Sequence, residues 1–271
     1  MIVVSSLAEE GAEVTVAALA LGAADTLPKP GTSRFNGRFS EVLLARLNAL
    51  GHADAEATRV DPGRAAMPLR AMPSAAPLGV LAIGASTGGI HSLGTLFQNL
   101  PPTLGVPILV TQHLPVPFMD VFARQITAAA KRGALVAQDG MVALPDQILI
   151  APGDAHLTLE VSNGLLPVVR LDRTPVRSGC LPSLDPMLAS VGDIYGAGAV
   201  GVILSGMGRD GTEGAKRLVG SGGAIIAQDQ ATSAVWGMPR SVAEAGLASA
   251  VLPPDKIARR VASRAGEQVW K

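Results

Sequence analysis

Residue types that can together perform nucleophilic catalysis occur at separate points of this chain. Residues 84–88 read Gly-Ala-Ser-Thr-Gly, which fits the pattern Gly-x-Ser-x-Gly. The pattern follows an aliphatic run and precedes an amphipathic segment, the context of a nucleophile elbow. A serine hydroxyl attacks efficiently only when a base takes its proton, and histidine, whose ordinary pKa is about 6.5, suits that role. Whether Ser86 can act as a nucleophile therefore depends on a nearby histidine and on an acid that orients the histidine.

Position along the chain separates the four histidines. His113 lies just beyond the aliphatic run 106–111, with Gln112 between them, so it is expected at the carboxyl end of a strand. His156 opens a predicted hairpin strand and is the second candidate for the base. His91 falls on a predicted helix, and His52 borders a segment with linker composition. Because lone histidines are commonly structural, the strand-end position favours His113.

An orienting acid is expected at another strand end. Asp210 lies in the glycine-rich stretch 204–211, after the most aliphatic run of the chain. Its alternative role is to cap the N-terminus of the next helix. The order serine, histidine, acid differs from the order serine, acid, histidine of α/β-hydrolases, so the pattern predicts a different topology.

The elements that position these residues predict an α/β fold. We expect a doubly wound, mainly parallel sheet with helices on both faces, a Rossmann-like three-layer arrangement. Helices are predicted over 88–100 and from an N-cap at Ser183 to Tyr195, and Asn163-Gly164 predicts a hairpin turn between strands 156–161 and 166–171. The sheet strands are predicted at residues 79–84, 106–111, 147–150, 199–204 and 224–227. Carboxyl ends of parallel strands share one edge, where open α/β sheets bind ligands.

Composition excludes several classes of function. There are 22 basic and 22 acidic residues, so no charge excess favours nucleic acid or an anionic membrane surface. The single cysteine, Cys180, forms no internal disulfide, and no Cys/His cluster has zinc spacing. The apolar stretch 15–24 is too short to span a bilayer. We therefore expect a cytoplasmic protein without membrane insertion, metal or cofactor.

Residue composition and hydrophobic periodicity divide the chain into three parts. Residues 53–77 alternate Asp, Arg, Pro, Ala and Met without periodicity, as expected of a linker. Residues 1–52 predict strands at 2–4 and 25–27 and helices at 9–21 and 38–50, too little to form a convincing domain alone. Residues 78–266 are expected to form the catalytic domain.

Taken together, several motifs in order resemble the catalytic domain of the CheB protein-glutamate methylesterases. The resemblance covers about 78–261 and implies Ser86 as nucleophile, His113 as base and Asp210 as its orienting partner. It also implies that Thr87 lies beside the nucleophile and that the amide of Met207 binds the oxyanion. The implied substrates are glutamate methyl esters, and glutamines, of methyl-accepting chemotaxis receptors. The motifs are residues 82–89, 111–115, 150–153, 204–211, 227–230 and 236–239.

The first part resembles the second half of a flavodoxin-like response-regulator receiver. Residues 4–6 match its switch-hydroxyl strand, and residues 27–30 match the lysine-proline that ends its last strand. In that family the receiver is phosphorylated on aspartate by a chemotaxis histidine kinase, which would be a further partner. The phosphoacceptor half has no counterpart before Met1, so we expect that this chain is not switched in the usual way.

Two other interpretations stay open on the sequence. The loop 84–89 could cradle a phosphate in a nucleotide-binding Rossmann-like module, although a full Gly-x-Gly-x-x-Gly pattern is missing. Alternatively, the first part could cover the catalytic face and leave a receptor-docking protein with little turnover.

Overall fold

A computed structural model provides the three-dimensional description of the chain. It describes residues 1–5, 12–28, 36–57, 69–71, 76–161 and 166–266. None of the helices in these ranges combines the length and apolar composition that a bilayer crossing demands.

A seven-stranded sheet, parallel throughout, forms the centre of the molecule. Its strand order is β11-β10-β9-β3-β4-β6-β5. The chain passes from β3 to β4 on one side, whereas β9 pairs with the opposite edge of β3, so β3 marks the switch point. The central strands are buried on both faces, which explains their uninterrupted aliphatic composition. The strands are β3 (Val80–Ala85), β4 (Ile108–Gln112), β5 (Ala134–Val136), β6 (Ile148–Ile150), β9 (Ala199–Ile203), β10 (Ala224–Gln228) and β11 (Ala248–Leu252).

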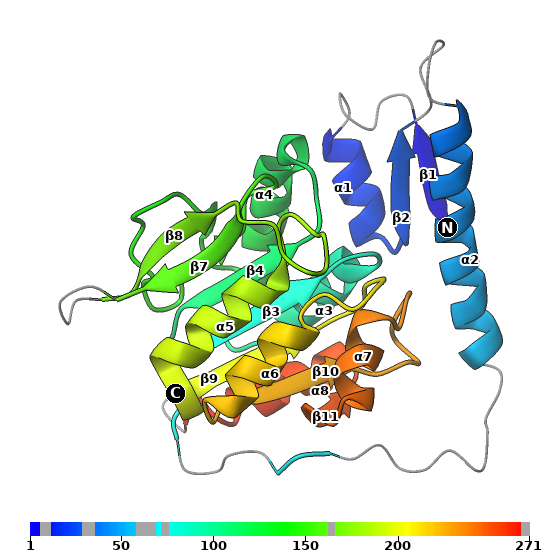
Figure 1. Cartoon of the computed structure of the whole chain (residues 1–271). Coiled ribbons are helices and arrows are strands. Elements are labelled where there is room, and N and C mark those ends of the chain that lie inside the picture. The colour runs from blue at the N-terminus through cyan, green and yellow to red at the C-terminus, as the bar shows by residue number, and fades with distance from the viewer. Residues whose placement is uncertain (6–11, 29–35, 58–68, 72–75, 162–165, 267–271) are drawn as a thin grey trace.

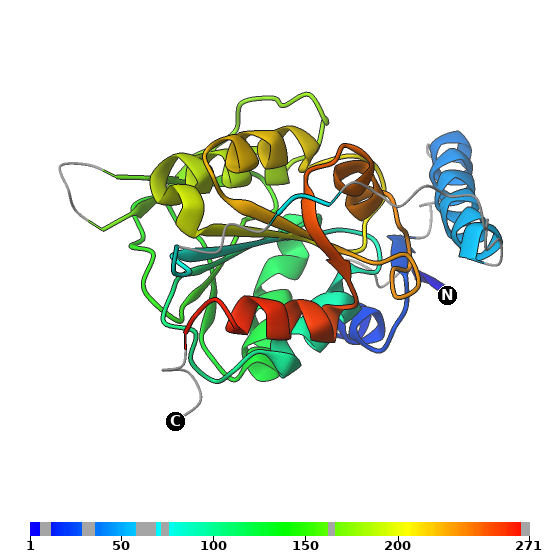
Figure 2. The ribbon, with the colours of Figure 1, turned by 90° about the horizontal axis from the view of Figure 1, so that it is seen from below.

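Helices cover both faces of this sheet, as Figure 2 shows edge-on. One face packs beneath α3 (Gly89–Asn99), α4 (Met119–Ala130) and α8 (Pro254–Ala262). The other face packs beneath α5 (Leu184–Tyr195), α6 (Thr212–Gly220) and α7 (Met238–Glu244). Each face has its own aliphatic core, so the predicted three-layer α/β class is confirmed. Short 3₁₀ turns, η1 (Val116–Phe118) and η2 (Gly196–Gly198), precede α4 and β9.

A two-stranded antiparallel hairpin extends from the sheet (Figure 1). Its strands are β7 (His156–Glu160) and β8 (Val168–Asp172), close to the predicted pair. The predicted Asn163-Gly164 turn lies outside the described residues.

In the described ranges, the N-terminal segment shares no sheet with the rest of the molecule. Within those ranges its strands β1 (Ile2–Ser5) and β2 (Asp25–Pro28) pair only with each other, in parallel, and α1 (Ala12–Ala20) lies between them in the chain. We call residues 76–161 and 166–266 the body of the molecule. Leu19 and Ala23 join the same apolar core as α3 and α4, so the N-terminal segment packs on the body through α1 and the residues that follow it. Residues 29 and 30 of the receiver-like match lie outside the described residues.

Element boundaries differ from prediction where local chemistry overrides the pattern. Strand β4 begins at Ile108 instead of residue 106, because Pro107 has no amide hydrogen for the ladder. Helix α2 (Asn36–Ala57) continues past the predicted end at residue 50 and into the stretch expected to be linker. The Ser183 cap is confirmed, since its side chain accepts a hydrogen bond from the Asp185 amide.

Candidate active site

Ser86 lies at the turn between β3 and α3. Its amide donates to the Ser205 carbonyl at 3.0 Å, and its carbonyl accepts from Gln112 Nε2 at 3.0 Å. These two bonds tie the turn to the loop after β9 and to the last residue of β4, the strands on either side of β3. The backbone that carries the serine is therefore fixed from both sides.

Glycines allow this turn for two different reasons. A Cβ at Gly84 would come within 2.1 Å of the Leu184 side chain, so only glycine lets α5 pack on β3. Gly88 has a φ of +75°, a conformation that side chains disfavour, and begins α3. The loop does not resemble an open phosphate cradle, since the Gly88 amide donates to Ala24 O and the Gly89 amide to Ser86 O.

His113 follows β4 and lies between the serine and an acid. Its Nδ1 is 3.1 Å from Ser86 Oγ, and its Nε2 is 2.9 Å from Asp210 Oδ2. Because the carboxylate can only accept, the neutral ring carries its proton on Nε2 and leaves the Nδ1 lone pair facing the serine. The ring orientation is the reverse of that in chymotrypsin-type triads, but the connectivity is the same.

Asp210 is held by a dense set of donors in the loop after β9. Ser183 Oγ donates to Oδ1 at 2.5 Å, and the Leu184 amide donates to Oδ2 at 2.8 Å. Burial alone would raise the pKa of this carboxyl group, but the hydrogen bonds from His113, Leu184 and Ser183 outweigh it and lower the pKa below 3.8. Asp210 is therefore a carboxylate at neutral pH. It does not cap α6, whose N-cap is Gly211.

The structure assigns other environments to the remaining histidines. His156 is 1% exposed, accepts from the Ser183 amide at Nδ1 and contacts Thr174 O through Nε2. Both of its nitrogens are thus used to support the loop that holds Asp210. His91 contacts Ala20 O of the N-terminal segment through Nδ1, and His52 falls within α2. Of the three histidines whose side chains the structure describes, only His113 contacts Ser86.

The accessory residues Thr87 and Met207 border the serine from two loops. Thr87 Oγ1 donates to Asp25 Oδ2 at 3.1 Å, so its hydroxyl is engaged by the N-terminal segment. Within the described part of the chain, the amides of Thr87 and Met207 donate to no protein acceptor. Between them, Gly206 leaves no room for a side chain, because a Cβ there would lie 2.9 Å from Ser86 Cβ.

Two cavities border the site. The smaller, of 150 Å³, lies over Ser86 and His113 and is walled by N-terminal residues. The larger, of 590 Å³, lies on the other side of Asp210. Ligand pockets commonly measure about 300–1,000 Å³, so the space over the serine is small for a substrate. The N-terminal residues of the small cavity are Leu19, Ala23, Ala24, Asp25, Thr26 and Arg46.

Sequence reasoning missed the groups that support the candidate triad. Gln112 precedes the histidine, and Ser183 was predicted only as a helix cap, although its hydroxyl contacts Asp210. Asp25 also escaped notice, yet it pairs with Arg46 at 2.6 Å and accepts from Thr87. A strand-end position was available as a signal for Gln112, but nothing local indicates the contacts of Ser183 or Asp25.

Comparison with known proteins places the chain in a family. The CheB methylesterase family profile matches residues 81–261. This chain belongs to the CheB methylesterase family. A CheB relative of Caulobacter vibrioides, named protein-glutamate methylesterase/protein-glutamine glutaminase 2, is 42% identical over 98% of this chain and 77% of its own. One from Anaeromyxobacter dehalogenans, bearing the same name with the number 3, is 42% identical over 97% and 76%.

A solved CheB structure has the same catalytic fold. The crystal structure of the Thermotoga maritima CheB methylesterase catalytic domain superposes with a TM-score of 0.66 at 38% identity. The match covers 69% of this chain and 99% of that one. The match thus spans almost the whole of that crystallised catalytic domain.

Proposed function

We propose that this chain hydrolyses γ-glutamyl methyl esters on methyl-accepting chemotaxis receptors and deamidates receptor glutamines at the same site. The observation that carries the proposal is the continuous contact from Ser86 Oγ through His113 to Asp210, in a chain of the CheB family. Such a relay is the arrangement that activates a serine for acyl transfer.

In the first step, Ser86 Oγ attacks the ester carbonyl carbon while its proton passes to His113 Nδ1. The resulting imidazolium keeps its Nε2 hydrogen bond to Asp210. Because Asp210 stays ionised at neutral pH, its negative charge stabilises the positive ring as the oxyanion forms.

The negative charge on the former carbonyl oxygen needs hydrogen-bond donors. We assign this role to the amides of Thr87 and Met207, which border the serine and donate to no other group of the described residues. Backbone amides that are already oriented cost little reorganisation as the charge develops.

Collapse of the tetrahedral intermediate transfers the Nδ1 proton to the leaving methoxide and releases methanol. Water, deprotonated by His113, then attacks the acyl-enzyme and frees the glutamate carboxylate. With a glutamine substrate the same proton goes to the amide nitrogen, so ammonia leaves instead.

A specific set of contacts supports a second candidate function: the N-terminal segment restricts access to Ser86. Asp25 accepts from Thr87, and Ala24 O accepts from the Gly88 amide at 2.8 Å. Both contacts fall on the residues that follow the nucleophile. A receptor helix cannot approach Ser86 from this side while α1 and β2 stay in place.

The division into a receiver-like segment at 1–52, a linker at 53–77 and a catalytic domain at 78–266 is part of this proposal, as is the cytoplasmic location. Chemotaxis receptors are the proposed substrates. A chemotaxis histidine kinase remains a proposed partner through the receiver-like segment.

Methanol release from methylated receptor tests the proposal. We expect release by the purified chain and a loss of about 10⁶-fold in Ser86→Ala, the size seen when a triad serine is removed. A folded Ser86→Ala variant with unchanged release would refute the assignment. Leu19→Asp places a charge in the α1 contact, and we expect it to raise turnover; equal or lower turnover with α1 displaced would refute the restriction.

A further inference from the structure

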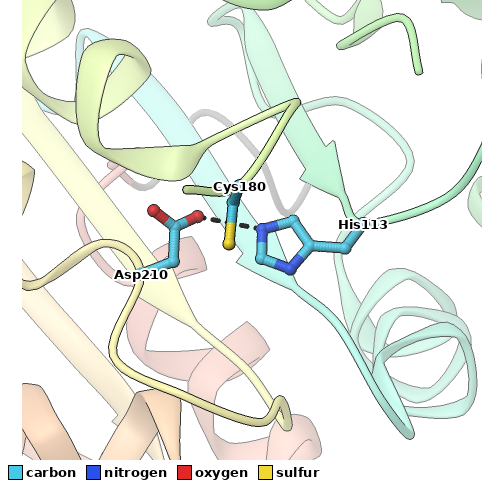
Figure 3. A group of neighbouring side chains, drawn as sticks. All are labelled: His113, Cys180 and Asp210. Atoms are coloured by element: carbon cyan, nitrogen blue, oxygen red, sulfur yellow. Dashed lines mark hydrogen bonds and ion pairs between the residues drawn. The ribbon is translucent and has the colours of Figure 1, made fainter. Parts of the chain in front are cut away.

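Cys180 lies beside the histidine and the acid of the candidate triad, and neither the mechanism nor the sequence analysis gives it a role. Its Sγ, an imidazole nitrogen of His113 and a carboxylate oxygen of Asp210 all lie within 4.8 Å of one another. Figure 3 shows the thiol directed toward the space between the ring and the carboxylate. It is a free cysteine and is half-buried.

The loop that holds Asp210 also places the thiol. Ser183 and Leu184 both donate to the Asp210 carboxylate, and Cys180 lies three residues before Ser183. The Cys180 amide donates to Ser178 Oγ at 3.3 Å, which fixes the start of the same loop. The thiol therefore faces the acid because of bonds that hold the acid itself.

We propose that His113, Cys180 and Asp210 bind a thiophilic divalent cation, Zn²⁺ above all, and that this binding inhibits the enzyme. Thiolate, imidazole and carboxylate form a three-ligand set that zinc accepts in tetrahedral geometry, with water as fourth ligand. The 590 Å³ cavity lies against Cys180 and Asp210 and has room for that water.

The required movement is small. Zinc–ligand distances of about 2.0–2.3 Å place tetrahedral ligand atoms about 3.3–3.6 Å apart. The nitrogen of His113 and the oxygen of Asp210 are already 2.9 Å apart, and the Cys180 sulfur lies within 4.8 Å of the ligand atoms of both residues.

Binding and catalysis exclude each other at these atoms. The cation takes the lone pair of His113 Nε2, so the neutral ring carries its single proton on Nδ1 and only the thiol proton leaves to solvent; no electron transfer occurs. Asp210 then neutralises the cation instead of the imidazolium. Because Nδ1 is protonated and has no free lone pair, His113 no longer accepts the proton of Ser86.

The inhibitory effect rests on the proposed function, whereas binding does not, so the experiment measures both. The full chain is titrated with Co²⁺ and with Zn²⁺, and the thiolate-to-cobalt charge-transfer absorption is recorded beside methanol release. We expect the absorption band in the wild-type chain, its loss on zinc addition, and inhibition that a chelator reverses. A band without inhibition would leave the metal site standing and overturn its effect on the hydrolase.

Cys180→Ser is the decisive variant. It removes the sulfur ligand of the proposed metal site, and Cys180 takes no part in the proposed hydrolysis. We expect basal turnover to persist, the cobalt band to vanish and the zinc concentration for half-inhibition to rise at least about tenfold, the scale of a lost metal contact. Asp185→Asn alters another acid on the same cavity and is expected to leave the band unchanged. An absent band in the wild type, or equal zinc sensitivity in Cys180→Ser, would overturn the proposal.

Discussion

The body of the molecule and its N-terminal segment are built on different principles. The body buries two aliphatic cores, one on each face of a seven-stranded sheet. The segment has a two-stranded sheet, and it contributes Leu19, on α1, and Ala23, which follows α1, to a core that belongs mainly to the body. The body therefore supplies its own stability, whereas the order of the segment depends on the body. We expect that a part held in this way can leave without unfolding the body.

After the loss expected in Ser86→Ala, the next largest effect is expected within the body, at Asp210, the acid of the candidate triad. Asp210→Asn keeps the size of the side chain but favours the wrong histidine tautomer, so we expect turnover to fall about 10⁴-fold. Methanol release under single-turnover conditions measures this loss. Ser183→Ala removes only one donor to Asp210 and serves as the milder control, and a loss as large as that of Asp210→Asn would contradict the assigned roles.

Replacing one buried leucine in each region with alanine compares the body and the N-terminal segment directly. Leu93 is fully buried between α3 and the sheet, so Leu93→Ala should lower the free energy of unfolding of the body by about 2–5 kcal/mol. Leu19 is 6% exposed, but we expect Leu19→Ala to loosen α1 first and to change the unfolding of the body by less than about 1 kcal/mol. Urea unfolding measures both, and equal losses would show that the segment and the body unfold as one unit.

Acid should act on the two regions with opposite sign. The pKa of Asp210 is lowered in the folded chain, so its stabilising contribution is present above pH 3.8 and is lost as pH falls below that value. Burial raises the pKa of Asp25 above 3.8 despite the charge of Arg46 and the bonds from Thr26 and Thr87. The docked segment thus favours protonated Asp25, and docking weakens as pH rises through the raised pKa.

Hydrogen exchange in α1 as a function of pH measures this docking. We expect protection, corrected for intrinsic exchange rates, to fall as pH rises from 3.8 through that pKa, and Asp25→Asn to flatten the trend. Protection that rises with pH in the wild-type chain would contradict the sign.

The smallest effect is expected at the exposed ion pair between Arg124 and Glu13, which joins the two regions at 2.9 Å. The two side chains are 63% and 78% exposed, so solvent screens the pair. We expect Glu13→Gln to change turnover by less than about twofold. A larger gain would show that charge, more than apolar packing, holds the segment in place.

The α/β fold and the residues at the strand ends could be predicted from the sequence, because both depend on local sequence patterns. Uninterrupted aliphatic runs predicted the buried parallel strands, and the ends of three such runs predicted that Ser86, His113 and Asp210 lie at one edge. The two edge strands, β5 and β11, were not predicted. Strand β5 has only three residues, which give too little periodicity, and β11 is only partly buried, so its pattern is weaker than that of the inner strands. The contacts of Ser183, Asp25 and Cys180 join residues far apart in the chain, and they depend on how loops pack.

The position of β9 beside β3 affects the chain while it is being synthesised. Ser86 and His113 emerge from the ribosome early, but Asp210 follows 97 residues after His113, which takes about 5–20 s at about 5–20 residues per second. During that time β3, which becomes an inner strand, has one edge without its final neighbour. An unfinished chain therefore has Ser86 without its proposed acid and an open strand edge, and we expect hydrolysis to begin only when the sheet is closed.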